Sequence, residues 1–183
     1  MAYHELIIAG TGGRGVLLIG RLLARAGMKN YEYVLFFPNY APAMRGGESE
    51  CTIILSDDPV SSPVMFEPSY AIAMTGSALA LMEKRVKPGG TLMIDSSVTS
   101  EKIARNDIKA FYIPASQKAV ETGGGQAANM VLLGAYAANT GAIALDLVEK
   151  ALDDMLQDKS KDTVLALNKR AINEGARLMA NYK

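Results

Sequence analysis

The chain of 183 residues has few of the side chains that build metal sites, disulfides and acid–base catalysts. It contains one cysteine, one histidine and no tryptophan. A single cysteine excludes an internal disulfide and any four-cysteine zinc or iron–sulfur site within the chain. It also favours a cytoplasmic location, because thiols stay reduced there. A histidine-based metal cluster is excluded for want of a second histidine.

The sequence also lacks an excess of charge and a long apolar run. Lysine and arginine number 19 and so do aspartate and glutamate, which gives no electrostatic argument for nucleic acid or a membrane surface. No apolar run approaches the ~20 residues of a membrane span. Glu5 follows His4 and the first strand begins at once, which argues against a cleaved signal peptide. The hydrophobic share of 49% and ten methionines favour association with another chain.

Strand and helix patterns alternate along the chain. We expect strands at 6–9, 31–37, 48–56, 70–74, 91–95 and 110–113. We expect helices from Val16 up to a cap at Gly27, at 77–86 and at 127–138, followed by two amphipathic C-terminal helices. Gly27 is expected to cap the first helix and Pro38 to end the second strand. The pattern predicts one Rossmann-like α/β domain over 1–183, with a mainly parallel sheet flanked by helices on both faces. The helix at 127–138 has no polar face, so this chain or a partner must cover it on all sides.

A glycine cluster separates the first strand from the first helix. Gly10, Gly12 and Gly15 stand at the spacing G-x-G-x-x-G, which permits a tight turn and leaves helix N–H groups free for a phosphate. Arg14 places a positive charge at the positive end of the helix dipole, which is unfavourable for the helix. A bound anion would explain why an arginine is present there. The alternative is a packing turn with Arg14 in solvent.

A nicotinamide dinucleotide site requires an acidic residue at the carboxyl end of the second strand. That end reads Leu-Phe-Phe-Pro at 35–38, and Glu32 lies at the other end. The missing acidic residue therefore argues against the hypothesis of a nicotinamide dinucleotide site but does not exclude it.

The segment 38–47 is the second candidate for binding an anion. Arg45 precedes Gly46 and Gly47, which places a planar cation beside backbone that can approach a phosphate or carboxylate closely. The alternative is a surface arginine at the start of a strand. If this loop lies at the same end of the sheet as Gly10–Gly15, both face one crevice.

Side chains suited to catalysis are few. His4 precedes the first strand and is expected to be exposed. Cys51 lies in the middle of a strand, where a buried inert thiol is expected. Asp95 ends a strand and either faces a ligand or caps the next segment. No serine lies in a G-x-S-x-G elbow.

Four segments occur in an order that resembles a known family. They read GTGGRGV at 10–16, YAPAMRGG at 40–47 with Cys51 behind it, SDDPVSSP at 56–63 and ANMVLLG at 128–134. Together they resemble the gamma subunit of 2-oxoacid:ferredoxin oxidoreductases, especially the 2-oxoglutarate or branched-chain 2-oxoacid type. The resemblance covers nearly the whole chain.

The resemblance implies a subunit of an enzyme that oxidatively decarboxylates a 2-oxoacid, with 2-oxoglutarate favoured, and passes the acyl group to coenzyme A and electrons to ferredoxin. It implies that thiamine diphosphate and iron–sulfur clusters are held by alpha and beta companions, with a ferredoxin-like delta subunit as a further candidate. This chain would bind coenzyme A, help assemble the complex and be inactive alone. A free-standing NAD(P)-binding oxidoreductase and a purely structural scaffold are the alternatives.

The implied coenzyme A site is carried over residue by residue. It comprises Gly10, Thr11, Gly12, Gly13, Arg14, Gly15, Tyr40, Arg45, Gly46, Gly47 and Asn129. Arg14 stands where family members commonly have glutamine, and Ala41 and Ala43 stand where a glycine and a glutamate are common. Asn129 matches the family's asparagine and is either a ligand or interface contact or a cap at the start of a helix.

Overall fold

The computed structural model describes residues 1–40, 48–156 and 162–182, and within them six strands form one sheet in the order β2-β3-β1-β4-β5-β6. The strands are β1 (Tyr3–Thr11), β2 (Tyr33–Tyr40), β3 (Glu48–Ser56), β4 (Tyr70–Ala73), β5 (Thr91–Asp95) and β6 (Lys109–Ile113). The helices are α1 (Val16–Gly27), α2 (Gly76–Arg85), α3 (Ala115–Glu121), α4 (Ala128–Thr140), α5 (Leu145–Met155) and α6 (Asp162–Ala180).

Strand β3 is the one described strand that runs against the others. It pairs antiparallel with both β2 and β1, whereas β1, β4, β5 and β6 pair in parallel. The strand β2 therefore has the direction of β1, and the expected mainly parallel α/β sheet is confirmed.

The register brings two candidate segments to one edge of the sheet. Thr11, the last residue of β1, pairs with Glu48, the first residue of β3. Tyr40, the last residue of β2, pairs with the neighbouring Ser49. Both ends of the 41–47 connection therefore lie at the edge where the glycine turn leaves β1, as the shared-crevice hypothesis requires.

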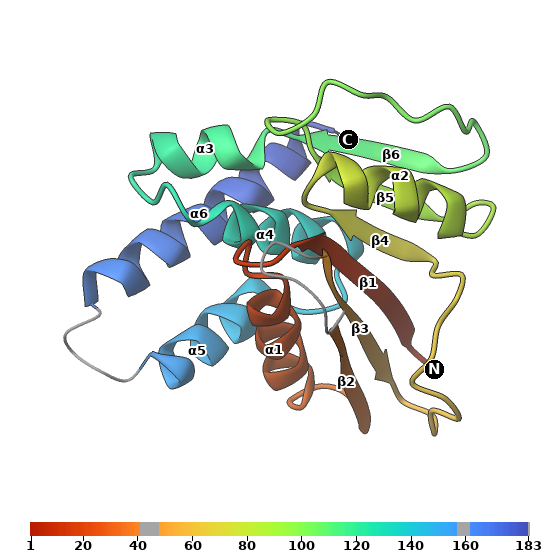
Figure 1. Ribbon diagram of the computed structural model, residues 1–183. Helices are drawn as coiled ribbons and strands as arrows, with labels where there is room; N and C mark the ends of the chain where they lie inside the picture. Colours follow the sequence, from red (N-terminus) through yellow and green to blue (C-terminus); the bar gives the residue numbers. More distant parts are fainter. Residues whose placement is uncertain (41–47, 157–161, 183) are drawn as a thin grey trace.

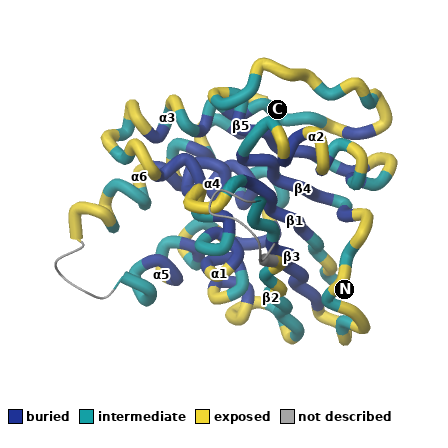
Figure 2. The backbone as a smooth tube through the Cα atoms, viewed as in Figure 1, coloured by how far each residue is buried: buried dark blue, intermediate teal, exposed yellow. Residues whose placement is uncertain are grey.

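Helices cover the two faces unequally (Figure 1). Helices α1, α3, α4, α5 and α6 pack into one large apolar core on one face, whereas α2 and nearby loops cover the other. Helix α4 is buried along most of its length, since the sheet and α6 enclose it (Figure 2). The expectation that 127–138 needs cover on all sides is confirmed, and this chain supplies much of that cover.

Close backbone approach explains how α4 and α6 pack together. A Cβ atom at Gly134 would lie 1.9 Å from the Ile172 carbonyl oxygen, and one at Gly175 would lie 1.9 Å from that of Val131. No side chain fits at either position, so the two helices cross in backbone contact.

Three local expectations are wrong. Strand β2 continues through Pro38, which pairs with Cys51, because β2 is an edge strand and loses no ladder bond there. Gly27 is not a cap but the buried last residue of α1, where a Cβ atom would lie 2.5 Å from Leu55 Cδ2. His4 lies within β1, half-buried against the Tyr31 ring, and not exposed before the strand.

The short helix α3 was not expected from the sequence. It follows Pro114 directly and has only seven residues. So short a segment shows little periodicity. No described helix is long and apolar enough to cross a membrane.

Candidate functional site

The glycine turn joins β1 to α1 at the carboxyl edge of the sheet. Gly13 and Gly15 have φ of 89° and 78°, a conformation in which other residues are strained. Gly10 is required for a different reason, since a Cβ atom there would lie 2.9 Å from Met74 Cβ. Thr11 is half-buried, and Gly12 and Gly13 are exposed to solvent. The turn therefore presents accessible backbone on a closely packed base.

Helix α1 begins at this turn without a side-chain cap. Its N-cap is Gly15, and no acidic residue lies in its first turn. The first helical bonds run from Leu18 and Ile19 to the Gly15 carbonyl, so the amides of Val16 and Leu17 precede the helical ladder. Backbone donors and the positive end of the helix dipole thus meet at one point, which suits an anion.

A cleft of about 440 Å³ opens beside the turn. Its walls come from the glycine turn with Leu18, from residues 123–127 with the start of α4, and from Val164, Leu167 and Asn168 at the start of α6. Arg14 lines this cleft and is exposed. Among the described residues that form the lining, Arg14 is the one charged side chain.

A second, smaller cleft of about 260 Å³ lies on another side of the same turn. It is lined by Thr11, Val16 and Leu17 and by Ser49 from β3. Ser49 is the residue that pairs with Tyr40 at the end of β2. The turn is therefore hollowed both toward α4 and toward the β2–β3 hairpin.

Sequence reasoning missed the second wall of the larger cleft. The run Gly123-Gly124-Gly125 predicts only a turn, yet it faces the first glycine turn across the cleft. Gly123 has φ of 85°, and Gln126 is exposed beside it. The available signal was a second glycine cluster directly before a helix, the same arrangement as at 10–15.

Asn129 joins the two glycine segments. It is 4% exposed, its Oδ1 accepts from the Met130 amide at 3.0 Å, and its Nδ2 donates to the Gly15 carbonyl across 3.5 Å. A Cβ atom at Gly15 would lie 2.2 Å from Nδ2. Asn129 is the second residue of α4, whose N-cap is Ala127 and which has no side-chain cap bond, so the cap alternative is wrong. The Asn129 residue lines the cleft.

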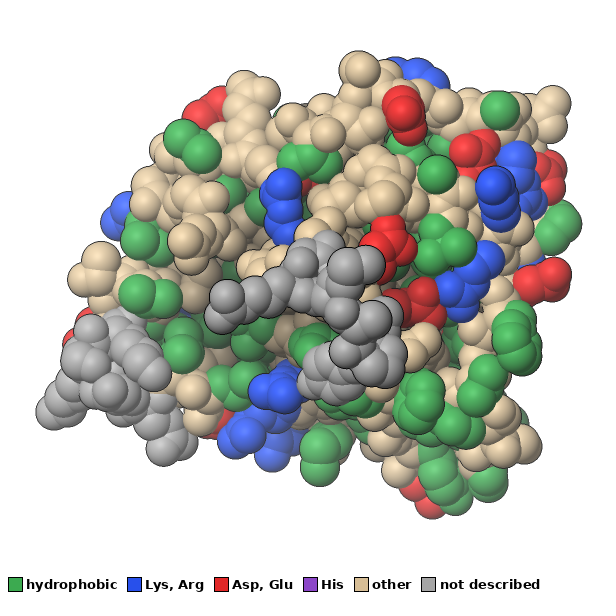
Figure 3. Space-filling view, viewed as in Figure 1, with side chains coloured by type: hydrophobic (Ala, Val, Ile, Leu, Met, Phe, Trp, Pro, Cys, Tyr) green, Lys and Arg blue, Asp and Glu red, His purple; other side chains and the backbone are tan. Residues whose placement is uncertain are grey.

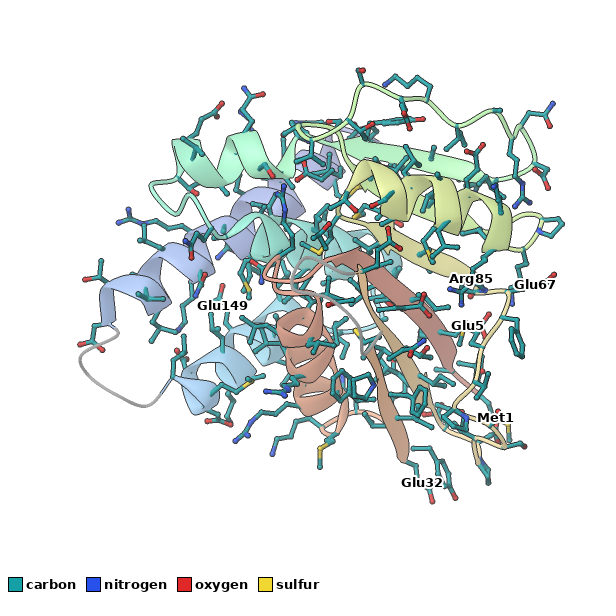
Figure 4. The ribbon with its side chains drawn as sticks, viewed as in Figure 1. Met1, Glu5, Glu32, Glu67, Arg85 and Glu149 are labelled. Atoms are coloured by element: carbon teal, nitrogen blue, oxygen red, sulfur yellow. The ribbon has the colours of Figure 1, made fainter. Side chains whose placement is uncertain are left out.

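The other sequence candidates lie as follows. Tyr40 ends β2 at the same edge, whereas Arg45, Gly46 and Gly47 lie outside the described residues. Glu32 directly precedes β2, at the end of the strand far from the glycine turn (Figure 4). A nicotinamide site requires an acidic residue at the carboxyl end of β2, and Glu32 lies at the opposite end of the strand.

The Asp95 side chain has a structural role. It is 1% exposed, and its carboxylate accepts from the Ser97 and Ser116 amides at 3.1 and 3.2 Å and from Ser116 Oγ at 2.5 Å. The capping interpretation is confirmed, since this carboxylate ties the end of β5 to the start of α3.

Ion pairs elsewhere also hold elements together. Arg85 Nη1 lies 2.6 Å from Glu50 Oε2, and Lys87 Nζ lies 2.6 Å from Glu5 Oε1. Figure 4 places Arg85 and Glu5 together on the side of the sheet away from α5. Among the described residues, no three histidine, cysteine, aspartate or glutamate side chains gather as a metal site requires.

The fold and the turn define a class: α/β proteins with a glycine-rich strand–turn–helix unit at the carboxyl edge of the sheet. The chain belongs to the pyruvate ferredoxin/flavodoxin oxidoreductase family, whose model matches residues 5–178. The family resemblance found in the sequence is thereby confirmed.

Curated relatives agree with this assignment. The chain is 31% identical over 183 residues to 2-oxoglutarate synthase subunit KorC of Methanothermobacter thermautotrophicus, covering 94% of this chain and 97% of that protein. It is 32% identical over 171 residues to ketoisovalerate oxidoreductase subunit VorA of Methanothermobacter marburgensis, covering 92% of this chain. That match spans only 35% of the VorA relative, about a third of its length.

Solved structures share the fold. The gamma subunit of a keto/oxoacid ferredoxin oxidoreductase from Geobacter sulfurreducens superposes with a TM-score of 0.82 at 26% identity, covering 99% of this chain and 98% of that one. A 2-oxoglutarate:ferredoxin oxidoreductase from Magnetococcus marinus, with 2-oxoglutarate, coenzyme A and succinyl-CoA bound, gives 0.88 at 24% identity. The match covers 99% of this chain and 32% of the Magnetococcus chain.

Proposed function

We propose that this chain, as one gamma-type domain over 1–183, binds coenzyme A in a cytoplasmic 2-oxoacid:ferredoxin oxidoreductase and helps to assemble that complex. The observation that carries the proposal is the uncapped N-terminus of α1, open to solvent at the Gly12–Gly15 turn. Coenzyme A carries a pyrophosphate and a ribose phosphate, which are the groups such a helix end binds well. The residues present therefore fit the phosphate part of the ligand.

The side chains at the cleft indicate which steps belong to this chain and which belong to its companion subunits. Its described residues supply backbone amides, carboxamides and Arg14 at the cleft, which bind and orient a ligand. Thiamine diphosphate and the clusters would belong to alpha and beta companions and to a ferredoxin-like subunit, and would supply decarboxylation and electron transfer when bound. The favoured substrate is 2-oxoglutarate, on the similarity to a 2-oxoglutarate synthase subunit over nearly its whole length.

The surface supports a role in an assembly. Phe66 is 76% exposed and Val64 54%, and Tyr3 from the start of β1 is 53% exposed. Hydrophobic side chains gather over the segment between β3 and β4 in Figure 3. Apolar surface of this kind is typical of a subunit seen without its companions.

Calorimetric titration of the purified chain with coenzyme A and, separately, NADH tests the proposal. We expect saturable binding of coenzyme A only. Arg14→Ala should weaken it about fivefold, because an exposed ion pair contributes up to about 1 kcal/mol. Arg45→Ala should weaken it as well. Wild-type affinity in both variants would refute the residue assignment, and NADH binding in place of coenzyme A would favour the free-standing oxidoreductase.

The scaffold alternative makes a different prediction. Co-purification should recover companion subunits under either function, but a pure scaffold would bind neither nucleotide, alone or assembled. The bound subunits, identified by mass spectrometry, would also report the composition of the complex.

A further inference from the structure

Helix α1 and the turn that follows it carry positive charge on their solvent side. Arg21, Arg25 and Lys29 stand at intervals of four residues, and all three are exposed. Arg21 and Arg25 lie on one face of α1, because residues four apart in a helix are neighbours, and Lys29 follows in the turn that ends the helix. We call these three residues the cationic row. In Figure 3, basic side chains gather over α1.

The stability of α1 does not explain the cationic row. Residues 6–31 contain four basic residues and no aspartate or glutamate, although the whole chain has 19 residues of each sign. Within the described part of the chain, one member of the row has an ion-pair partner: Arg25 Nη2 lies 3.5 Å from Asp154 Oδ2, and both side chains are exposed. Like charges four residues apart destabilise a helix by up to about 0.5 kcal/mol. The helix dipole favours cations at the end of α1 but offers little to Arg21 in its middle.

A cavity of about 340 Å³ opens beside the end of the row, between α1 and α5. The buried residues Ala26 and Ala151 contribute apolar surface to it, and Met28, which is 71% exposed, also lines it. Lys150 from α5 adds a cation to the two that Arg25 and Lys29 provide. The described lining therefore combines apolar surface with three cations against one carboxylate, that of Asp154.

The extent of the row favours a protein over a small anion as its partner. Arg21 does not line the cavity, so an anion bound there would leave this arginine without a role, whereas a protein surface can cover the row and the cavity together. Arginine and methionine are enriched in protein interfaces, and a side chain buried in a pocket often supplies much of the binding energy. A surface that covers cations must present carboxylates, because a buried unpaired charge is costly.

We infer that the cationic row and the adjoining cavity are the docking surface for an acidic face of a companion subunit, one apolar side chain of which enters the cavity. The inference rests on the proposed function in one respect: it takes the partner from the assembly proposed above. Complementary charges of this kind raise the rate and specificity of association, and added salt weakens them. Assembly through this surface is therefore salt-dependent.

Carbodiimide cross-linking of the co-purified complex tests this inference. The reagent joins a lysine amine directly to a carboxylate, so it reports contact with an acidic residue. We expect Lys29 and Lys150 to be linked to aspartate or glutamate residues of one companion subunit, which mass spectrometry identifies. Both lysines should also be acetylated at least about fivefold more slowly in the complex than in the isolated chain, because a docked face excludes the reagent.

Arg21→Glu reverses one charge of the row outside the cavity. In the isolated chain it should not lower the free energy of unfolding, because a carboxylate four residues before Arg25 is favourable in a helix. It should weaken assembly about tenfold at low salt and less at high salt, as expected for the reversal of an exposed charge. Sedimentation velocity at graded sodium chloride measures this. Arg170→Glu makes the same change at an exposed residue of α6 and is the matched control.

The outcomes separate this inference from the proposed function. If Lys29 and Lys150 react equally in the complex and in the isolated chain, or if Arg21→Glu assembles like Arg170→Glu, the inference fails, while coenzyme A binding still supports the proposed function. If Arg21→Glu instead raises only the KM for ferredoxin, the row meets the electron carrier and the inference also fails. If the lysines cross-link as expected but the chain binds no coenzyme A, the docking surface stands and the proposed function fails.

Titration of the isolated chain with sodium citrate tests the remaining alternative, a small anion in the cavity. We expect no saturable binding that depends on Lys150. Citrate binding that Lys150→Gln abolishes, with Lys150 still reactive in the complex, would assign the cavity to a small anion and overturn the docking surface.

Discussion

The Cys51 thiol lies in the middle of β3, fully buried against α1. Its Sγ lies 3.6 Å from the Val16 carbonyl, and a Cβ atom at Gly20 would lie 2.8 Å from the sulfur. Burial, helped by the nearby Glu50 carboxylate, raises the pKa of the thiol to about 12. The sulfur is therefore protonated at neutral pH and takes no part in thiol chemistry.

Cys51 should accordingly resist alkylation in the native chain at about pH 8, because the reactive thiolate is scarce there and access is blocked. The measurement is the rate of iodoacetamide labelling by mass spectrometry. The same chain in guanidinium chloride is the control and should label readily, because the unfolded pKa is near 8.5. Fast labelling under native conditions would mean that β3 opens away from α1.

Individual side chains show where sequence reasoning ends. Cys51 and Asp95 were interpretable because a thiol in an apolar run and a carboxylate at a strand end have few roles. Asn129 was not, since its contact with Gly15 joins residues 114 positions apart. The Gly123–Gly125 wall was missed for the same reason: which turns face each other is decided by tertiary packing.

Among the elements, α4 and α6 depend most on glycine. Gly134→Ala or Gly175→Ala would place a methyl group 1.9 Å from a backbone oxygen of the other helix, so the helices must separate. We expect each substitution to lower the free energy of unfolding by about 3 kcal/mol, at the upper end of overpacking costs. Urea unfolding followed by circular dichroism measures this.

Gly125→Ala provides the matched control for these variants. A Cβ atom there would meet nothing within 4 Å, and its φ is not in the left-handed region. Its unfolding free energy should stay within about 0.5 kcal/mol of wild type. Equal losses in all three variants would show that the α4–α6 crossing is not specially sensitive.

Most elements were predictable because the apolar runs are short and bounded by glycine and proline. Strand direction was harder: β3 reverses because it returns from β2 in a hairpin, and it then inserts between β2 and β1. The end of β2 was misjudged because a proline breaks a central strand but not an edge strand. That distinction requires the strand order, which local sequence does not contain.

In the proposed function, the whole molecule binds a ligand but depends on other subunits for the chemical reaction. The two clefts beside the glycine turn lie at one edge of the sheet. The described residues gather no metal-ligating cluster, and apolar side chains are exposed between β3 and β4. The first VorA relative extends this unit to nearly three times its length, since the match spans 35% of that protein. Chemistry supplied by other chains and binding supplied by this one would then be separable in kinetics.

This separation gives a prediction for the assembled complex. If this chain only binds coenzyme A, Asn168→Asp should raise the KM for coenzyme A about tenfold, with kcat and the KM for 2-oxoglutarate unchanged, because the variant removes binding common to ground state and transition state. The assay is 2-oxoglutarate-dependent reduction of ferredoxin at varied coenzyme A. The control is Asn30→Asp, the same chemical change at an exposed residue beyond the end of α1 that lies away from the glycine turn. A fall in kcat at saturating coenzyme A would instead mean that this cleft also orients the thiol for acyl transfer, and the chain would then take part in the chemical step.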